Sequence, residues 1–413
     1  MNSKAVIKMK RSTSGFVGSH LREARKIRGQ TATALAEQLG LTKQAISSYE
    51  TGHKSPSPEV SDRISEILDL PIEFFLSKDS GRSRDISPRF YRSMAAATKT
   101  AREKAESKSN LLIQLTEIVE SLVEIPLPNL PDFKPPSDPN KITTEYIENA
   151  AIEARAFWGL GNGPISNVVW LLENNGVLIV RRSLEASTLD AFSLWVDERP
   201  YVLLSTDKGS AVRSRFDIAH ELGHLLLHRN VPNLCVQTSN YFKLIESQAH
   251  RFAGAFLFPE KSFVMEIVNC NLEAFRLMKR RWKVSIAMML KRSQDLELVG
   301  EKKAELLWRY YMKNGWKTQE PFDDIIEIEQ PYLLKESIQL ILDEGILSST
   351  ELVEELRMYH RDVEDIAGLP QDFLAPKTNN LLQLKLRKLS AETTTYVEKA
   401  EILEFSNRHA VKN

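Results

Sequence analysis

Two histidines and a glutamate between Phe216 and His228 have the types and spacing of a metal-dependent hydrolytic site. His220 and His224 are four residues apart, so on an α-helix their imidazoles lie on one face and can share a tetrahedral metal ion. Glu221 then lies beside the open coordination position, where its carboxylate can take a proton from bound water. The neighbouring residues are rich in Ala and Leu, which favours a helix and predicts a dry, buried site.

A buried structural helix can carry the same five-residue pattern by chance, so the third ligand decides between the two interpretations. Glu246 opens a second amphipathic segment that ends at Pro259, and a carboxylate on a second packed helix is a natural third ligand. His228 lies one further turn along the first helix, too far along a straight axis to reach the same metal. His250 lies over Glu246 at i+4, and spacing alone leaves it open as the third ligand.

The segment AHELGHLLLH, followed by Glu-x-x-Ala-x-x-Phe-Ala and ending in Leu-Phe-Pro, resembles the ImmA/IrrE family of metallopeptidases. The resemblance runs from about Ile142 to Pro259. It implies a zincin-like fold in which His220, His224 and Glu246 bind the metal and Glu221 is the catalytic base. Two His and one Glu suit Zn²⁺, and Mn²⁺ also fits such ligands.

The composition of the whole chain restricts its class. It has 413 residues, enough for two or three domains, and balances 55 basic against 55 acidic residues. This balance argues against a polyanion-binding protein or an acidic tail. Two cysteines, Cys235 and Cys270, exclude a disulfide framework and fit a reducing cytoplasm. No apolar run is long enough to cross a bilayer and no hydrophobic signal core is present, so we expect a cytoplasmic protein with no membrane partner.

Charge is uneven at the N-terminal end, where residues 1–55 hold ten Lys and Arg against three Glu. A local positive field of this kind suits a phosphate backbone. Residues 1–15 have the composition of a basic, disordered arm. From 16 to 77 the pattern predicts short helices, with Thr31, Thr42 and Ser57 as their N-caps.

The stretch ALAEQLGLTKQAISSYETG holds a small Ala, a turn Gly, a buried Ile and a Tyr-Glu-x-Gly ending. It resembles the helix-turn-helix domain of the XRE, or lambda-repressor-like, family, whose third helix enters the major groove of double-stranded DNA. We expect Ile46 to face the core. Ala32 departs from the family pattern, since relatives often carry a phosphate-holding Gln there. The side chains expected to contact DNA are Lys43, Gln44, Ser47, Ser48 and Lys54.

The remainder of the chain divides into a connector, a body and a helical end. Residues 78–141 combine a polar segment, a helix and a Pro-rich stretch, which is typical of a connector. The pattern of residues 142–300 predicts helices, a small sheet with a hairpin, and the two helices expected to hold the metal of the peptidase domain. Residues 301–380 predict a helical accessory domain with its acidic side chains facing outward. Residues 381–413 form a polar tail.

These features predict a multidomain protein with an all-α helix-turn-helix head, an α+β zincin-like metallopeptidase domain and an α-helical C-terminal region. We expect a DNA-binding transcriptional regulator that carries a zinc-dependent endopeptidase. The resemblance implies cleavage of a helix-turn-helix repressor, or of a protein of its own kind, which relieves repression under stress or in a mobile element. The expected partners are an operator in double-stranded DNA and a protein substrate, and the architecture allows a homodimer. The alternative is a non-proteolytic transcription factor that uses the metal fold to sense a ligand or a stress.

Overall fold

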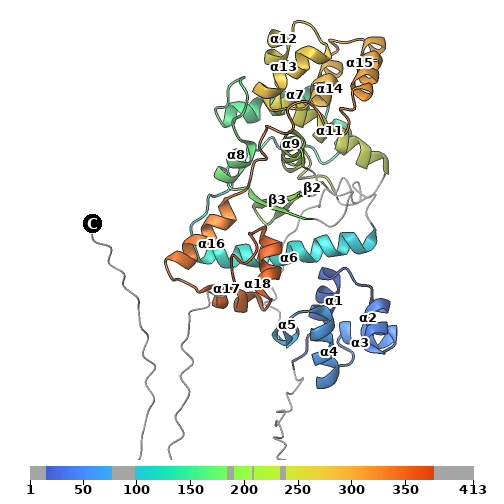
Figure 1. The fold of residues 1–413 in the computed structure, drawn as a ribbon, viewed down its shortest axis with the longest axis vertical. Helices are drawn as coiled ribbons and strands as arrows, with labels where there is room; N and C mark the ends of the chain where they lie inside the picture. The colour runs from blue at the N-terminus through green and yellow to red at the C-terminus, as the bar shows by residue number, and fades with distance from the viewer. Residues whose placement is uncertain (1–14, 77–97, 184–189, 207–208, 233–238, 376–413) are drawn as a thin grey trace, which may run out of the picture. The chain divides into compact units, whose positions relative to one another are not determined.

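The computed structural model describes five stretches of the chain: 15–76, 98–183, 190–206, 209–232 and 239–375. Helices predominate, and one small sheet lies among them (Figure 1). The expected basic arm and polar tail fall outside the described residues. Within the described stretches, no helix has both the length and the apolar character needed to span a membrane.

Residues 15–76 form five helices: α1 (Gly18–Ile27), α2 (Ala32–Leu39), α3 (Lys43–Glu50), α4 (Pro58–Leu68) and α5 (Ile72–Leu76). The expected N-caps are present, because Thr31, Thr42 and Ser57 each accept a hydrogen bond from the backbone N–H three residues on. Arg25 of α1 donates to the buried Glu50 at 2.6 Å and so holds α1 against the end of α3. The core of this head contains Leu21, Leu35, Ile46, Ile64 and Phe75.

The next segment leads into the sheet through helices on either side of an extended Pro-rich stretch. Its elements are α6 (Lys99–Leu122), the 3-10 helix η1 (Pro139–Lys141), α7 (Thr144–Phe157) and α8 (Val168–Asn174). The side chains of Thr98, Thr143 and Asn167 cap α6, α7 and α8, which explains where each helix begins.

The sheet has three strands, β1 (Leu178–Arg182), β2 (Ala191–Val196) and β3 (Arg199–Ser205), in the order β1-β3-β2. β1 runs parallel to β3, and β2 forms the expected antiparallel hairpin with β3, with Ser193 opposite Val202. Asp197 makes the turn with a φ of 51°. Side chains alternate across the sheet, so that Trp195 and Val202 enter one core while Leu194 and Leu203 enter the other.

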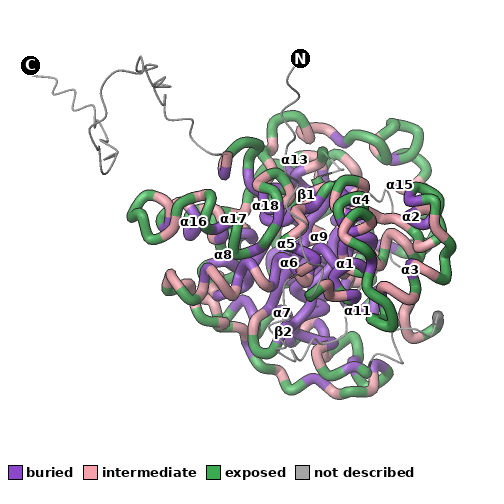
Figure 2. Tube along the Cα trace, turned by 90° about the horizontal axis from the view of Figure 1, so that it is seen from below, coloured by how far each residue is buried: buried purple, intermediate pink, exposed green. Residues whose placement is uncertain are grey.

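Two long helices cover one face of this sheet. α9 (Ala211–Leu227) contacts β2 and β3, and α11 (Ser239–Leu257) packs along α9 and α7. Leu222 of α9 and Phe252 of α11 join Val202 in the same core. On the other face, Leu203 shares a core with residues of α6. Figure 2 shows the buried residues in purple along the sheet and α9. Helix α9 is therefore held between two packed layers.

The C-terminal helices divide between the two cores. They are α12 (Glu260–Glu266), α13 (Leu272–Trp282), α14 (Ile286–Asp295), α15 (Glu301–Lys313), α16 (Leu333–Asp343), α17 (Ser349–Leu356) and α18 (His360–Ala367). α15 packs on α14 and places Leu307 and Tyr311 in the core that contains α9 and α11. α16, α17 and α18 pack on α6 instead. The helices expected between 301 and 380 are present, but they pack into two different cores.

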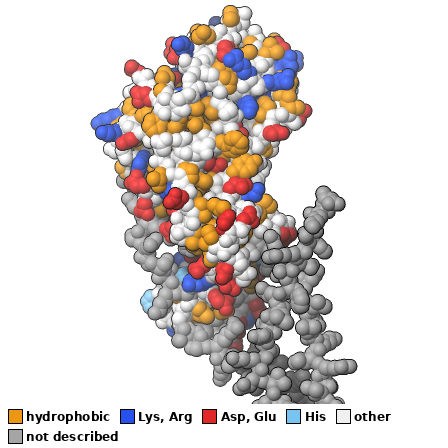
Figure 3. Space-filling view, turned by 90° about the vertical axis from the view of Figure 1, so that its left-hand side faces the viewer, with side chains coloured by type: hydrophobic (Ala, Val, Ile, Leu, Met, Phe, Trp, Pro, Cys, Tyr) orange, Lys and Arg blue, Asp and Glu red, His pale blue; other side chains and the backbone are white. Residues whose placement is uncertain are grey.

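The expectation that the acidic residues of this region face outward is wrong for Glu320. Its side chain is buried, and its carboxylate accepts the backbone N–H groups of Ile286 and Ala287 at the start of α14. A carboxylate is stabilised there because the first N–H groups of a helix have no partner within the helix. Elsewhere on the surface, the face drawn in Figure 3 carries acidic and basic side chains interspersed, in keeping with the neutral composition.

Candidate functional site

α9 brings the two histidines together as their spacing requires. Both side chains are buried, and the Nε2 atoms of His220 and His224 lie 3.0 Å apart. The rings are nearly perpendicular, at 87°, with their centroids 4.6 Å apart. Two imidazole nitrogens at this separation face one common point beside the helix.

Glu246 of α11 reaches the same point from the neighbouring helix. One of its carboxylate oxygens lies 3.5 Å from His220 Nε2, and the other lies 3.4 Å from His224 Nε2. Burial raises the pKa of the Glu246 carboxyl, but hydrogen bonding to His220 and His224 and their charge outweigh burial, so that its pKa is lowered overall. The carboxylate form, which is the form that binds a metal, is therefore favoured at this position.

These three side chains fit a divalent metal by both chemistry and spacing. In a tetrahedral zinc site with bonds of about 2.0–2.1 Å, neighbouring ligand atoms lie about 3.3–3.4 Å apart. The corresponding separations here are 3.0, 3.4 and 3.5 Å. His220, Glu221 and His224 also form a metal-type cluster, with one ligand atom from each within 4.8 Å of the others. The geometry thus brings two histidines and two glutamates to one place.

Glu221 differs from Glu246 in what surrounds it. It is buried, and the Ser193 hydroxyl of β2 donates to its Oε2 at 2.7 Å. The strand alternation that sends Trp195 toward α9 sends Ser193 to the same side. Strand β2 therefore orients the Glu221 carboxylate beside the two imidazoles. Ser193 is not among the residues predicted from the sequence, although the alternation of strand β2 indicates which side it faces.

The two other histidines of these helices take different positions. His228 is buried behind His224, with its Nδ1 atom 3.0 Å from the Nδ1 of His224 and its Nε2 atom 3.0 Å from Oε1 of Gln248. Burial lowers the pKa of His228 well below its ordinary value, and the neighbouring His224 adds to this. His250 packs against His220, with 4.6 Å between ring centroids, and stacks on Phe216.

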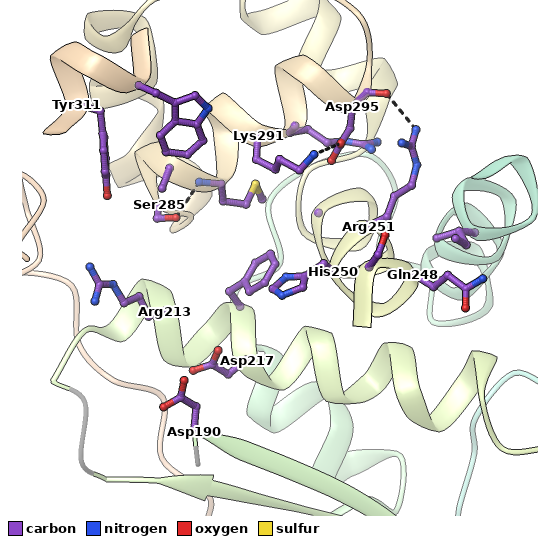
Figure 4. Close-up of a pocket in the computed structure, with 18 of the residues that line it drawn as sticks. Asp190, Arg213, Asp217, Gln248, His250, Arg251, Ser285, Lys291, Asp295 and Tyr311 are labelled. Atoms are coloured by element: carbon purple, nitrogen blue, oxygen red, sulfur yellow. Dashed lines mark hydrogen bonds and ion pairs between the residues drawn. The ribbon is translucent and has the colours of Figure 1, made fainter. Parts of the chain in front are cut away.

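A cavity of about 920 Å³ opens on the His250 side of the centre. Its wall includes the aromatic and methionine side chains of Phe216, Met288, Trp308 and Tyr311. Figure 4 shows His250 reaching into it from α11, with Asp190, Arg213 and Asp217 along the α9 side. Several of its charges are paired within the protein, for example Lys291 with Asp295 at 2.7 Å. The cavity is thus mainly an apolar space next to the centre.

The residues expected to contact DNA lie on α3 and in the turn after it. Lys43, Gln44, Ser47 and Lys54 are exposed, and Ser48 is half-buried. Ile46 is completely buried, as expected. The exposed polar side of α3 therefore faces away from the core of the head.

Models of known families match both the helix-turn-helix head and the segment that holds the candidate centre. Residues 172–294 match the model of the IrrE N-terminal-like domain, peptidase family M78, and residues 21–75 match a helix-turn-helix model. The chain joins a helix-turn-helix domain to an IrrE N-terminal-like domain. The four centre residues fall within the IrrE-like domain, and α3 falls within the helix-turn-helix domain.

The relatives found by sequence are named as helix-turn-helix regulators, and each matches a short part of the chain. Two proteins named as uncharacterized HTH-type transcriptional regulators, from Sinorhizobium medicae and Rhizobium meliloti, are each 35% identical over 72 residues, which is 17% of this chain and 52% of theirs. A regulator of the same description from Bacillus subtilis, YqaE, is 33% identical over 61 residues, 15% of this chain and 53% of its own. The chain thus spans about half the length of the curated relatives it matches.

Proposed function

We propose that this protein is a DNA-binding transcriptional regulator whose IrrE-like domain is a zinc-dependent endopeptidase. The observation that carries the proposal is the triangle of donor atoms from His220, His224 and Glu246, with sides of 3.0 to 3.5 Å. A structural histidine pair would not require a carboxylate from a second helix at the spacing of a metal ligand.

The chemistry follows from these donors and from Glu221. A Zn²⁺ or Mn²⁺ ion held by His220, His224 and Glu246 would supply a Lewis acid that acidifies water and polarises a peptide carbonyl. Glu221 takes the proton of the attacking water and passes it to the amine of the departing chain. The hydrogen bond from Ser193 keeps the carboxylate of Glu221 directed toward that water.

We infer that the substrate approaches the centre from the side of the neighbouring cavity. Its wall includes His250 and Phe216, which lie against the ligand His220. An extended peptide bound there would place its apolar side chains against Met288 and Trp308. We infer that the substrate is a helix-turn-helix repressor or a second copy of this chain, so that one gene product combines operator binding and cleavage.

Metal content and substrate cleavage test this function together. The purified protein is expected to bind about one divalent ion per chain, and His220→Ala, His224→Ala and Glu246→Ala should each remove it, because two ligands do not hold zinc tightly. His250→Ala is the matched control and should keep the metal. Loss of metal in His250→Ala together with retention in Glu246→Ala would move the third ligand to His250. Mass spectrometry of the metal-loaded protein, incubated alone and with candidate repressors, should show new peptide termini.

A further inference from the structure

Gln248 lies on α11 two residues after Glu246. Its side chain is hydrogen-bonded to the segment that precedes α7. Its Nε2 atom lies 2.7 Å from the carbonyl oxygen of Pro139 and 2.8 Å from that of Ile142. Carbonyl oxygens only accept hydrogen bonds, so the atom facing both of them must be the amide nitrogen, which donates both of its hydrogens. The backbone at residues 139–142 therefore fixes the orientation of this buried amide.

The orientation of the amide in turn fixes the proton on His228. Oε1 of Gln248 can only accept, so Nε2 of His228, 3.0 Å away, must carry a hydrogen and donate it. A neutral imidazole with its hydrogen on Nε2 has an acceptor at Nδ1. That acceptor lies 3.0 Å from Nδ1 of His224. The hydrogen of His224 must then lie on its Nδ1, and its Nε2 presents a lone pair.

We propose that Gln248 and His228 are positioning residues that hold His224 in the tautomer whose Nε2 lone pair faces the metal centre. This inference rests on the proposed metal function and extends it to two residues that are not ligands. Nε2 of His224 is the atom that lies 3.0 Å from His220 Nε2 and 3.4 Å from the Glu246 carboxylate. A continuous series of donors and acceptors thus connects the backbone at Pro139 and Ile142 to a metal ligand.

Gln248 and His228 are both buried, so a role in positioning has to be distinguished from a role in packing alone. Three substitutions make that distinction. Gln248→Met keeps the length of the side chain but removes its donors and acceptor. His228→Leu keeps an apolar volume and removes both ring nitrogens. His228→Gln retains an acceptor and a donor on one side chain, and is the conservative variant that positioning predicts will restore function.

The experiment measures zinc affinity of the full chain by competition with a chromophoric chelator. Gln248→Met and His228→Leu are expected to weaken zinc binding about 10–100-fold, as loss of the partner of a metal-bound histidine does in other sites. His228→Gln should recover most of that loss. Folded Gln248→Met or His228→Leu protein, verified by circular dichroism, that binds zinc as tightly as the unmodified chain would overturn the proposal. A wild-type chain that binds no zinc would instead overturn the metal function itself.

A second measurement needs no variant. Long-range ¹H–¹⁵N spectra of the metal-free chain, with ¹⁵N-labelled histidine, report which ring nitrogen carries the hydrogen. The expected result is a hydrogen on Nε2 of His228 and on Nδ1 of His224. A hydrogen on Nδ1 of His228 contradicts the inferred direction of the series, whether or not the chain binds zinc.

Discussion

Gly223 of α9 lies directly against Ala249 of α11. A Cβ atom at Gly223 would come within 3.2 Å of the Ala249 Cα and 3.1 Å of the Phe252 ring. The two backbones approach this closely beside the proposed ligands, since Gly223 directly precedes His224 and Ala249 lies three residues after Glu246. The close approach is what allows a carboxylate from α11 to reach imidazoles on α9.

Gly223→Ala should therefore loosen the metal centre. The added methyl group must push α11 outward by a few tenths of an ångström, because a backbone atom of Ala249 cannot rotate away. We expect zinc affinity to fall by a factor of about 10, even though Ala favours a helix over Gly by roughly 1 kcal/mol. Gly254→Ala on α11 is the matched control, since its Cβ would meet only Arg292 at an ordinary 3.7 Å. Equal zinc affinities in the two variants would refute this role of Gly223.

The helix-turn-helix head should bind DNA through α3 and the turn after it. Gln44→Ala should relax sequence preference and weaken operator binding by about 1–3 kcal/mol, the cost of losing a two-bond contact to adenine. Lys54→Ala should weaken binding to all DNA sequences alike and make the affinity less dependent on salt concentration. A lysine that contacts a phosphate carries no sequence information. Lys302→Ala, on the exposed side of α15, is the control. Operator binding that survives removal of residues 1–76 would disprove the assignment of the head.

Glu173 makes the packing of α16 depend on pH. Its buried carboxylate accepts the backbone N–H groups of Tyr332 and Leu333 at the start of α16. Burial raises its pKa to about 7, against the opposing effect of these two hydrogen bonds. The folded chain then keeps the proton up to about pH 7, whereas the unfolded chain loses it near its ordinary value of 4.5.

The contribution of Glu173 to stability is thus complete below about pH 4.5 and is lost as the pH rises to about 7. The loss amounts to at most about 3 kcal/mol, from the size of the pKa difference. Hydrogen exchange of the α16 amides, corrected for intrinsic rates, should show weaker protection at pH 7.5 than at pH 5. In Glu173→Gln that difference should disappear. Unchanged pH dependence in this variant would assign the effect to another group.

The sequence predicts the parts of the centre that depend on local geometry. The i, i+4 spacing places His220 and His224 together on any helix. In the head, the N-caps Thr31 and Thr42 likewise locate the first residues of α2 and α3. The backbone partners of Gln248, at Pro139 and Ile142, are 109 and 106 residues away along the chain, and no local pattern indicates them. They depend on how α11 packs on the η1 segment, which only the folded structure contains.

Acidic side chains illustrate the same limit. A charged residue in a polar helical region is expected on the surface, because burial of an unpaired charge is costly. Glu320 is buried nonetheless, since it meets the N-terminus of α14 and the ammonium group of Lys279 at 2.9 Å. Neither partner is near it in sequence. The interactions that offset the cost of burying its charge are therefore tertiary contacts.

Glu221→Gln tests the central claim most directly. The amide is nearly the same size as the carboxylate, and the proposed ligands His220, His224 and Glu246 remain, so the variant should keep its metal and its DNA binding. It cannot accept the proton of the attacking water, and the cleavage rate should fall by a factor of about 10²–10⁴ or more. In cells the controlled promoter should stay in one state, as if the inducing signal never arrived. A variant that answers the signal like the unmodified protein, although it no longer has the proton acceptor, would show that the metal fold acts as a sensor and not as a peptidase.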